Sequence, residues 1–150
     1  MTMKTLISIL LTLALLCMGI GMAETSESQE AETMKLWIGE AAVSVVWEDN
    51  DAVRALRKLV AEQPLTIEMS MYGGFEQVGS IGTDLPRNDT QTTTQAGDIV
   101  LYAGDQMVVF YGSNSWAYTR LGRVTDKTAG EMAELLSGGD VTITVAMFEE

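Results

Sequence analysis

The residues best suited to ligand recognition lie in one segment of the C-terminal third of the chain. Trp116, Tyr118 and Arg120 are spaced two apart in a run that has the alternation of a β-strand. Side chains alternate across a strand, so all three are expected to project from one face. Two aromatic rings beside a guanidinium can hold an extended peptide or an anionic group by stacking and cation–π contact. An exposed stripe with a purely structural role has the same spacing, and both interpretations stay open.

The composition excludes several kinds of chemistry. The chain has 150 residues with no histidine and one cysteine. It therefore lacks an imidazole base, a Ser-His-Asp triad and histidine metal ligands, and one cysteine forms neither an internal disulfide nor a thiolate zinc site. Thioethers suit Cu(I), but the methionines at 69, 71, 107, 132 and 147 fall at core-facing positions and favour packing. We expect no catalytic residue, metal ion or cofactor.

The charge balance limits the partners. Twenty-one acidic residues stand against nine basic ones, for a formal net charge of −12. Nucleic acids and anionic lipids are bound through lysine and arginine, so neither is expected as a partner. We expect a monomer that binds a small molecule or an extended peptide segment. The acidic residues at 48, 49 and 51 are explained by capping of a helix.

The N-terminal segment has the pattern of an export signal. Lys4 precedes an uncharged apolar stretch that ends in small residues at Ala23. We predict a signal peptide over 1–23, an acidic linker over 24–33 and one domain over 34–150. The protein is then secreted or periplasmic and keeps no cysteine. An uncleaved segment that anchors the chain in a membrane is the alternative.

Periodicity predicts a mainly β domain with two helices. One helix begins at the N-cap oxygens of 49–51 and ends at Pro64, and the other begins with a capping box at Thr128 and Glu131. A long polar loop is expected over 83–96. Short strands joined by hairpin turns favour a closed antiparallel barrel whose ends the helices cover. Strands are predicted over 34–38, 42–48, 65–72, 75–81, 99–102, 107–111, 116–124 and 141–147.

Four segments resemble a known family. These are the runs at 64–69, 96–102, 108–111 and 118–124, which read PLTIEM, AGDIVLY, VVFY and YTRLGRV. Together they look like the small bacterial cyclophilin-like-fold family, over about 34–148. The resemblance implies a closed eight-stranded antiparallel barrel capped by two α-helices. The biochemical role of that family is largely unassigned.

True cyclophilins, which share this topology, are peptidyl-prolyl isomerases, and the resemblance does not extend to their signature. Their third strand carries Phe-His-Arg, whereas the matching strand here reads LTIEMSMY and places Glu68 and Met69 in that region. The isomerase arginine stabilises the twisted amide, and an acidic residue there has the wrong sign. An arginine that reaches the pocket from elsewhere, Arg87 or Arg120, would favour the isomerase.

We therefore predict an exported binding protein that performs no covalent chemistry. An extracytoplasmic peptidyl-prolyl isomerase or folding helper is the alternative, and an envelope interaction module becomes attractive if the N-terminal segment is not cleaved. Glu68 and Tyr72 lie on the strand that corresponds to the isomerase signature. The predicted ligand-binding residues are Trp116, Tyr118, Arg120, Glu68 and Tyr72.

Overall fold

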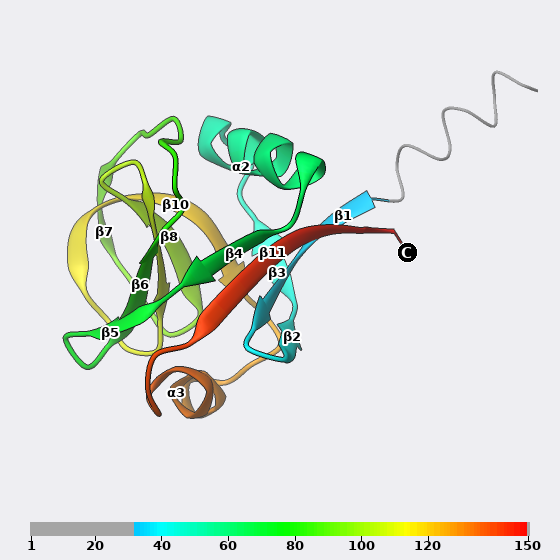
Figure 1. The fold of residues 1–150 in the computed structure, drawn as a ribbon. Coiled ribbons are helices and arrows are strands. Elements are labelled where there is room, and N and C mark those ends of the chain that lie inside the picture. Colours follow the sequence, from blue (N-terminus) through cyan, green and yellow to red (C-terminus); the bar gives the residue numbers. More distant parts are fainter. Residues whose placement is uncertain (1–31, 150) are drawn as a thin grey trace, which may run out of the picture. The chain divides into compact units, whose positions relative to one another are not determined.

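Strands make up nearly half of the residues that the computed structural model describes, which are 32–149. The predicted signal peptide over 1–23 and most of the predicted linker over 24–33 lie outside the described residues. Within them the order is β1 (Glu32–Ile38), β2 (Ala41–Val43), β3 (Val45–Trp47), α2 (Asp51–Glu62), β4 (Leu65–Glu68), β5 (Ser70–Tyr72), β6 (Glu76–Ser80), β7 (Thr90–Thr93), β8 (Asp98–Tyr102), β9 (Gln106–Phe110), β10 (Ser115–Val124), α3 (Ala129–Leu136) and β11 (Thr142–Glu149) (Figure 1).

The strands form two sheets. One has the order β2-β1-β11-β4, and the other has the order β3-β10-β8-β9-β6-β5, with β7 paired to β10. The mainly β class with two helices is confirmed for the described residues. The closed eight-stranded barrel is not observed there, because neither sheet of the described residues closes on itself and two of the predicted strands are each broken in two.

The difference arises where two predicted strands each pass from one sheet to the other. The first breaks between β2 and β3 at Ser44, whose backbone N–H donates to the Asp126 carboxylate at 3.0 Å. The second breaks between β4 and β5 at Met69, whose N–H donates to the Val141 carbonyl at 2.9 Å. Corners of this kind are how a strand changes sheet in packed β structures.

The corner at Met69 depends on a glycine in β6. A Cβ atom at Gly79 would lie 2.5 Å from the backbone oxygen of Glu68 and 2.7 Å from both the Ile67 Cγ2 and the Met69 Sδ atoms. Backbone cannot move aside as a flexible side chain can. The absence of a side chain at Gly79 therefore permits the close approach of the segment that turns from β4 into β5.

The first helix begins and ends where the sequence predicts. The Asn50 side chain accepts a hydrogen bond from the Val53 N–H at 2.9 Å and caps α2. The Asn50 Nδ2 atom also donates to the Arg120 carbonyl at 2.8 Å, which ties the helix start to β10. The helix ends two residues before Pro64.

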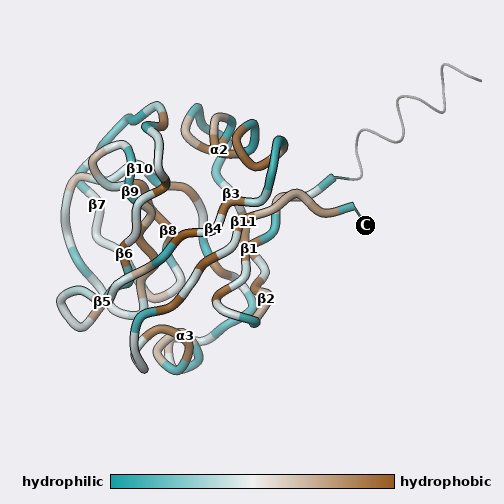
Figure 2. Tube along the Cα trace, in the orientation of Figure 1, coloured by the Kyte–Doolittle hydropathy of each residue, from teal (hydrophilic) through white to brown (hydrophobic). Residues whose placement is uncertain are grey.

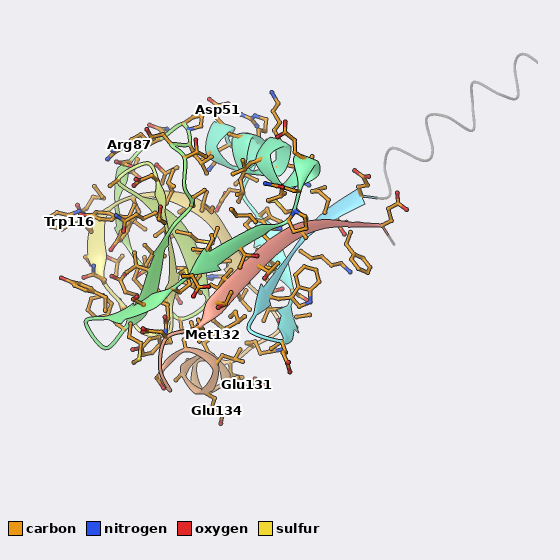
Figure 3. The ribbon with its side chains drawn as sticks, in the orientation of Figure 1. Asp51, Arg87, Trp116, Glu131, Met132 and Glu134 are labelled. Atoms are coloured by element: carbon orange, nitrogen blue, oxygen red, sulfur yellow. The ribbon has the colours of Figure 1, made fainter. Side chains whose placement is uncertain are left out.

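The second helix has the predicted capping box, with Thr128 and Glu131 each accepting from the other's backbone N–H. Met132 points inward from α3, whereas Glu131 and Glu134 point to solvent (Figure 3). The buried Gln77 of β6 donates from its Nε2 atom to the carbonyls of Leu136 and Gly139, at 2.8 and 2.7 Å. This contact fixes the end of the helix against the sheet.

The larger sheet carries buried apolar residues on both faces. Figure 2 shows hydrophobic positions, in brown, among its strands. Its inner face packs with the smaller sheet and both helices in the main core, to which it contributes Ile99, Leu101, Met107, Val109 and Leu121. Its outer face carries a second cluster of buried residues, formed by Val100, Val108, Phe110 and Tyr118. Successive residues of a strand alternate between these two faces, so the sheet separates two apolar layers.

Two local predictions are wrong. The segment predicted as a polar loop contains β7, whose threonines pair with β10 and whose Thr92 is buried. Threonine is β-branched and suits a half-buried strand even where no apolar residue marks it. Met71, predicted to face the core, is 39% exposed, because the corner at Met69 interrupts the alternation of the strand.

Neither α2 nor α3, the helices of the described residues, has the length and apolar character that crossing a membrane requires.

The Gly79 contact predicts a stability change. Gly79→Ala should lower the free energy of unfolding by about 1–3 kcal/mol, because the added methyl meets the Glu68 carbonyl. Gly138→Ala is the matched control, since its added methyl meets nothing within 4 Å. Urea denaturation of both variants checks this. Equal stability of the two would show that β4 and β6 do not approach as closely as described.

Candidate functional site

A pocket of about 430 Å³ opens on the outer face of the larger sheet. Strands β5, β6, β8, β9 and β10 all contribute to it. Val108 and Tyr118 are buried at its base, whereas Tyr72 and Trp116 are exposed at its rim. The apolar and aromatic lining is Tyr72, Val78, Tyr102, Val108, Trp116 and Tyr118, and the polar lining is Glu76, Gln106 and Asn114.

The rings of this face are in mutual contact. The Tyr118 ring meets the Tyr102 ring edge-on at 6.2 Å between centroids and the Phe110 ring at 5.8 Å. Phe75 extends the series, with its centroid 6.5 Å from Phe110 and 6.3 Å from Tyr72. Edge-to-face and offset pairs at such distances stabilise ring clusters, so the pocket wall is held by ring packing.

Glu76 is the charged residue of the pocket lining. Strand pairing places it between Tyr72 of β5 and Phe110 of β9. It is only 7% exposed, and its Oε2 atom has no hydrogen-bond partner among the described residues. Burial raises the pKa of the Glu76 carboxyl from 4.5 to about 7.

Hydrogen bonding fixes the Tyr118 ring at the base of the pocket. The Asn114 Nδ2 atom donates to the Tyr118 hydroxyl at 2.8 Å. Burial, and to a smaller extent the nearby Glu76 and Tyr102, raise the pKa of the Tyr118 phenol above its ordinary value, against the effect of the Asn114 hydrogen bond. Tyr118 is therefore neutral at physiological pH.

Three of the five predicted site residues line this pocket, and two lie elsewhere. Tyr72, Trp116 and Tyr118 come together there. Glu68 is exposed on β4, where it pairs with Thr142 of the smaller sheet. The corner that follows Glu68 separates it from Tyr72, although the two belong to one predicted strand.

Arg120 lies at a second depression, of about 440 Å³, lined by residues of β3 and β10 and by Glu48 and Thr125. Its Nη1 atom is 3.4 Å from the Asp98 Oδ2 atom, and the Arg123 Nε atom donates to the Asp98 Oδ1 atom at 2.9 Å. The Asp98 carboxylate is fully buried. Arg120 is thus held by an ion pair and does not line the aromatic pocket.

The remaining arginine proposed from sequence is also engaged elsewhere. The Arg87 Nε atom donates to the Asp89 carboxylate at 2.8 Å, and the Thr119 hydroxyl donates to the same carboxylate at 2.7 Å. Figure 3 shows Arg87 nearer to α2 than Trp116 is. No arginine or lysine of residues 32–149 lines the aromatic pocket.

The described part of the chain contains no group of three His, Cys, Asp or Glu side chains suited to hold a metal ion. The pocket therefore offers rings, two amides and one carboxyl as its means of recognition.

The comparisons with known proteins agree with this architecture. The model of the cyclophilin-like family matches residues 36–146. The chain belongs to the cyclophilin-like family. The resemblance inferred from the four sequence segments is thereby confirmed, and no curated protein matches the chain.

Two solved structures share the fold of this cyclophilin-like chain. McbB in complex with tryptophan has a TM-score of 0.55 at 12% identity, over 76% of this chain and 44% of McbB. The hypothetical protein AF2241 from Archaeoglobus fulgidus, solved in solution, has a TM-score of 0.55 at 15% identity, over 77% of this chain and 95% of that protein. The chain thus spans less than half the length of McbB.

Sequence reasoning missed all three residues of the polar lining, Glu76 above all. Tyr72 pairs with Glu76 across a three-residue connection, whereas a two-residue turn at the glycines 73 and 74 pairs Tyr72 with Phe75. A shift of one residue moves a side chain to the other face of a sheet. The positive φ of both glycines, 65° and 73°, belongs to this longer turn, which the Gly-Gly pair alone does not distinguish from a shorter one.

The burial of Glu76 predicts a pH-dependent difference in stability. The folded-state pKa lies above the unfolded value, so the carboxyl ionises in the unfolded chain first and stability is lost as pH rises from about 4.5 to 7. Glu76→Gln removes this loss. The free energy of unfolding of Glu76→Gln minus that of the wild type should therefore increase by about 2 kcal/mol between about pH 5 and pH 8.

Urea denaturation at the two pH values measures this, with Glu68→Gln as the control for loss of one exposed carboxyl. A Glu76→Gln difference that stays constant with pH would mean that the Glu76 carboxyl is not desolvated in the folded protein.

The ion-pair network at the second depression predicts another change. Asp98→Asn keeps the side-chain shape but removes the charge that two arginines share, so stability should fall by about 1–3 kcal/mol. The control is Asp49→Asn, which removes a fully exposed partner of Arg54 and should change stability by less than about 1 kcal/mol. Thermal and urea unfolding check both variants. Equal losses of stability in the two would show that the ion pairs of Asp98 contribute no more than the exposed pair of Asp49.

Proposed function

We propose that this protein is a non-catalytic binding protein that takes a small molecule or an extended peptide segment in the aromatic pocket. One observation carries the proposal: a ring-lined pocket opens on the outer face of the larger sheet, and no arginine of the described residues lines it. Its volume of about 430 Å³ lies within the usual range of ligand sites, and a mainly apolar lining with a few polar groups is typical of them.

The same observation argues against the alternative, a peptidyl-prolyl isomerase. That reaction needs a group that stabilises the twisted amide, and the resemblance to cyclophilins implies a guanidinium for this role. Arg87 and Arg120 are instead paired with Asp89 and Asp98. The charged group that lines the aromatic pocket is a carboxyl, Glu76, and not a guanidinium.

McbB, which was solved in complex with tryptophan, supports a small-molecule ligand by analogy of fold. Fold alone does not carry function, so the ligand of this chain must be argued from its own pocket.

The proposal includes export and a monomeric protein. The apolar segment ending at Ala23 supports a secreted or periplasmic location, with membrane anchoring as the alternative if it is not cleaved. The net charge of −12 supports a partner other than nucleic acid or an anionic membrane.

Titration of the purified protein tests the proposal. Aromatic amino acids, small aromatic amines and extended tripeptides are added while the Trp116 indole N–H signal is followed by NMR. We expect at least one class of compound to shift that signal with a Kd below about 1 mM, which corresponds to a binding free energy of roughly −4 kcal/mol. Trp116→Ala should weaken this binding at least about tenfold, because it removes a whole ring from the rim.

Val46→Ala is the matched control, since it shortens an exposed side chain at the second depression and should leave binding unchanged. A panel without any member that binds at the pocket would overturn the proposal. In parallel, an assay of proline isomerisation in a peptide should show the uncatalysed time constant of about 10–100 s. Acceleration that Trp116→Ala abolishes would favour the isomerase instead.

A further inference from the structure

Glu76 is the feature of the pocket that the proposed function leaves unexplained. The residue is more than nine-tenths buried, it lines the pocket, and its buried Oε2 atom has no hydrogen-bond partner among the described residues. An unpartnered buried carboxyl is destabilising, and native proteins leave few such groups. A group of this kind at a ligand pocket is explained if the ligand supplies the missing donor.

The described residues do not supply the opposite charge. Arg87 pairs with Asp89, and Arg120 and Arg123 share Asp98. The pocket lining contains no lysine or arginine of residues 32–149. No described residue therefore places positive charge in the pocket beside Glu76.

The rings around Glu76 favour a cation as well. Tyr72, Tyr102, Trp116 and Tyr118 line the same pocket, and the ring faces of tyrosine and tryptophan attract cations. Burial at the base strengthens both this attraction and the ion pair, because water screens them less. An anion at this place would instead meet the carboxyl and the negative faces of the rings.

We propose that the pocket binds a small organic ammonium compound, with its N–H group donating to the Glu76 carboxylate and its remaining surface against the surrounding rings. The inference rests on the proposed binding function and names its ligand class. The net charge of −12 adds a long-range attraction for cations. A donor on the ammonium accounts for the vacant acceptor at Oε2, which a fully methylated cation leaves unfilled.

The state of Glu76 makes this binding depend on pH. Tyr72 of β5, Tyr102 of β8 and Tyr118 of β10 are the titratable groups that face it, and β9 adds the uncharged Gln106 and Val108. Phenols are neutral near pH 7, so Glu76 is the group of the lining that changes charge there. Since burial raises its pKa to about 7, affinity for a cation should rise as pH increases through this value.

The experiment compares two probes with one skeleton, 2-phenylethylamine and 2-phenylethanol, which differ in carrying an ammonium or a hydroxyl group. Calorimetric titration of the full chain at about pH 8 should show the amine bound at least about tenfold more tightly than the alcohol. Lowering the pH to about 6 should weaken amine binding by about tenfold, because most of Glu76 is then protonated. Alcohol binding should not weaken.

Two variants of equal charge provide the controls. Glu76→Gln should remove the preference for the amine and its pH dependence, whereas Glu68→Gln, which lies outside the pocket, should keep both. Circular dichroism of each variant confirms that it is folded.

The outcomes separate this inference from the proposed function. Equal binding of amine and alcohol, lost in Trp116→Ala, would refute the ammonium ligand and leave the binding pocket intact. Stronger binding of the alcohol at low pH would mean that protonated Glu76 acts as a donor, which also refutes it. Binding of neither probe, together with no response in the wider panel, would overturn both proposals.

Discussion

The corner at Met69 is the constraint on which the site depends. It carries one continuous segment out of the smaller sheet and into the larger one, and it requires a glycine at 79 because the Glu68 carbonyl passes where a Cβ would lie. Beyond the corner, β5 pairs with β6 and brings Tyr72 beside Glu76. Without the change of sheet, Tyr72 would continue along the smaller sheet with Glu68, and the pocket would lose one wall.

The larger sheet, into which this corner leads, has two buried faces. The inner face closes the main core, which both helices cover, and the outer face is left to a small cluster around Phe110 and Tyr118. Rings that contact each other edge-on hold that cluster, and among residues 32–149 a pocket lies open over them. Glu76 is buried in this layer at the expense of stability, because its Oε2 atom has no hydrogen-bond partner among the described residues.

Helix caps and most strand positions could be predicted from the sequence, whereas the pairing register between distant segments could not. Asn50, Thr128 and Glu131 cap their helices through contacts within three residues, and alternation located nearly every strand. The corner at Met69 has no signal in its own residues, since it depends on a glycine ten positions away. β7 was missed because its threonines carry no apolar pattern. For the site, the spacing of Trp116 and Tyr118 predicted that both lie on one face of their strand, and both line the pocket. The turn after Tyr72 is one residue longer than a two-residue turn, and this extra residue brings Glu76 to the same face.

The outer face of the larger sheet separates the charged groups at one end from the rings at the other. Residues four apart in a strand are separated by about 13 Å, so Trp116 and Arg120 share a strand but not a site. Asp98, fully buried, draws Arg120 and Arg123 to one end, and the other end retains rings and the lone carboxyl of Glu76. The charged group that lines the aromatic pocket is thus an acid that is neutral or negative near pH 7, whereas proline isomerisation is assisted by a positive charge. The ammonium ligand that we propose would bring to this end the positive charge that the described lining of the pocket lacks, with the Glu76 carboxylate as its partner.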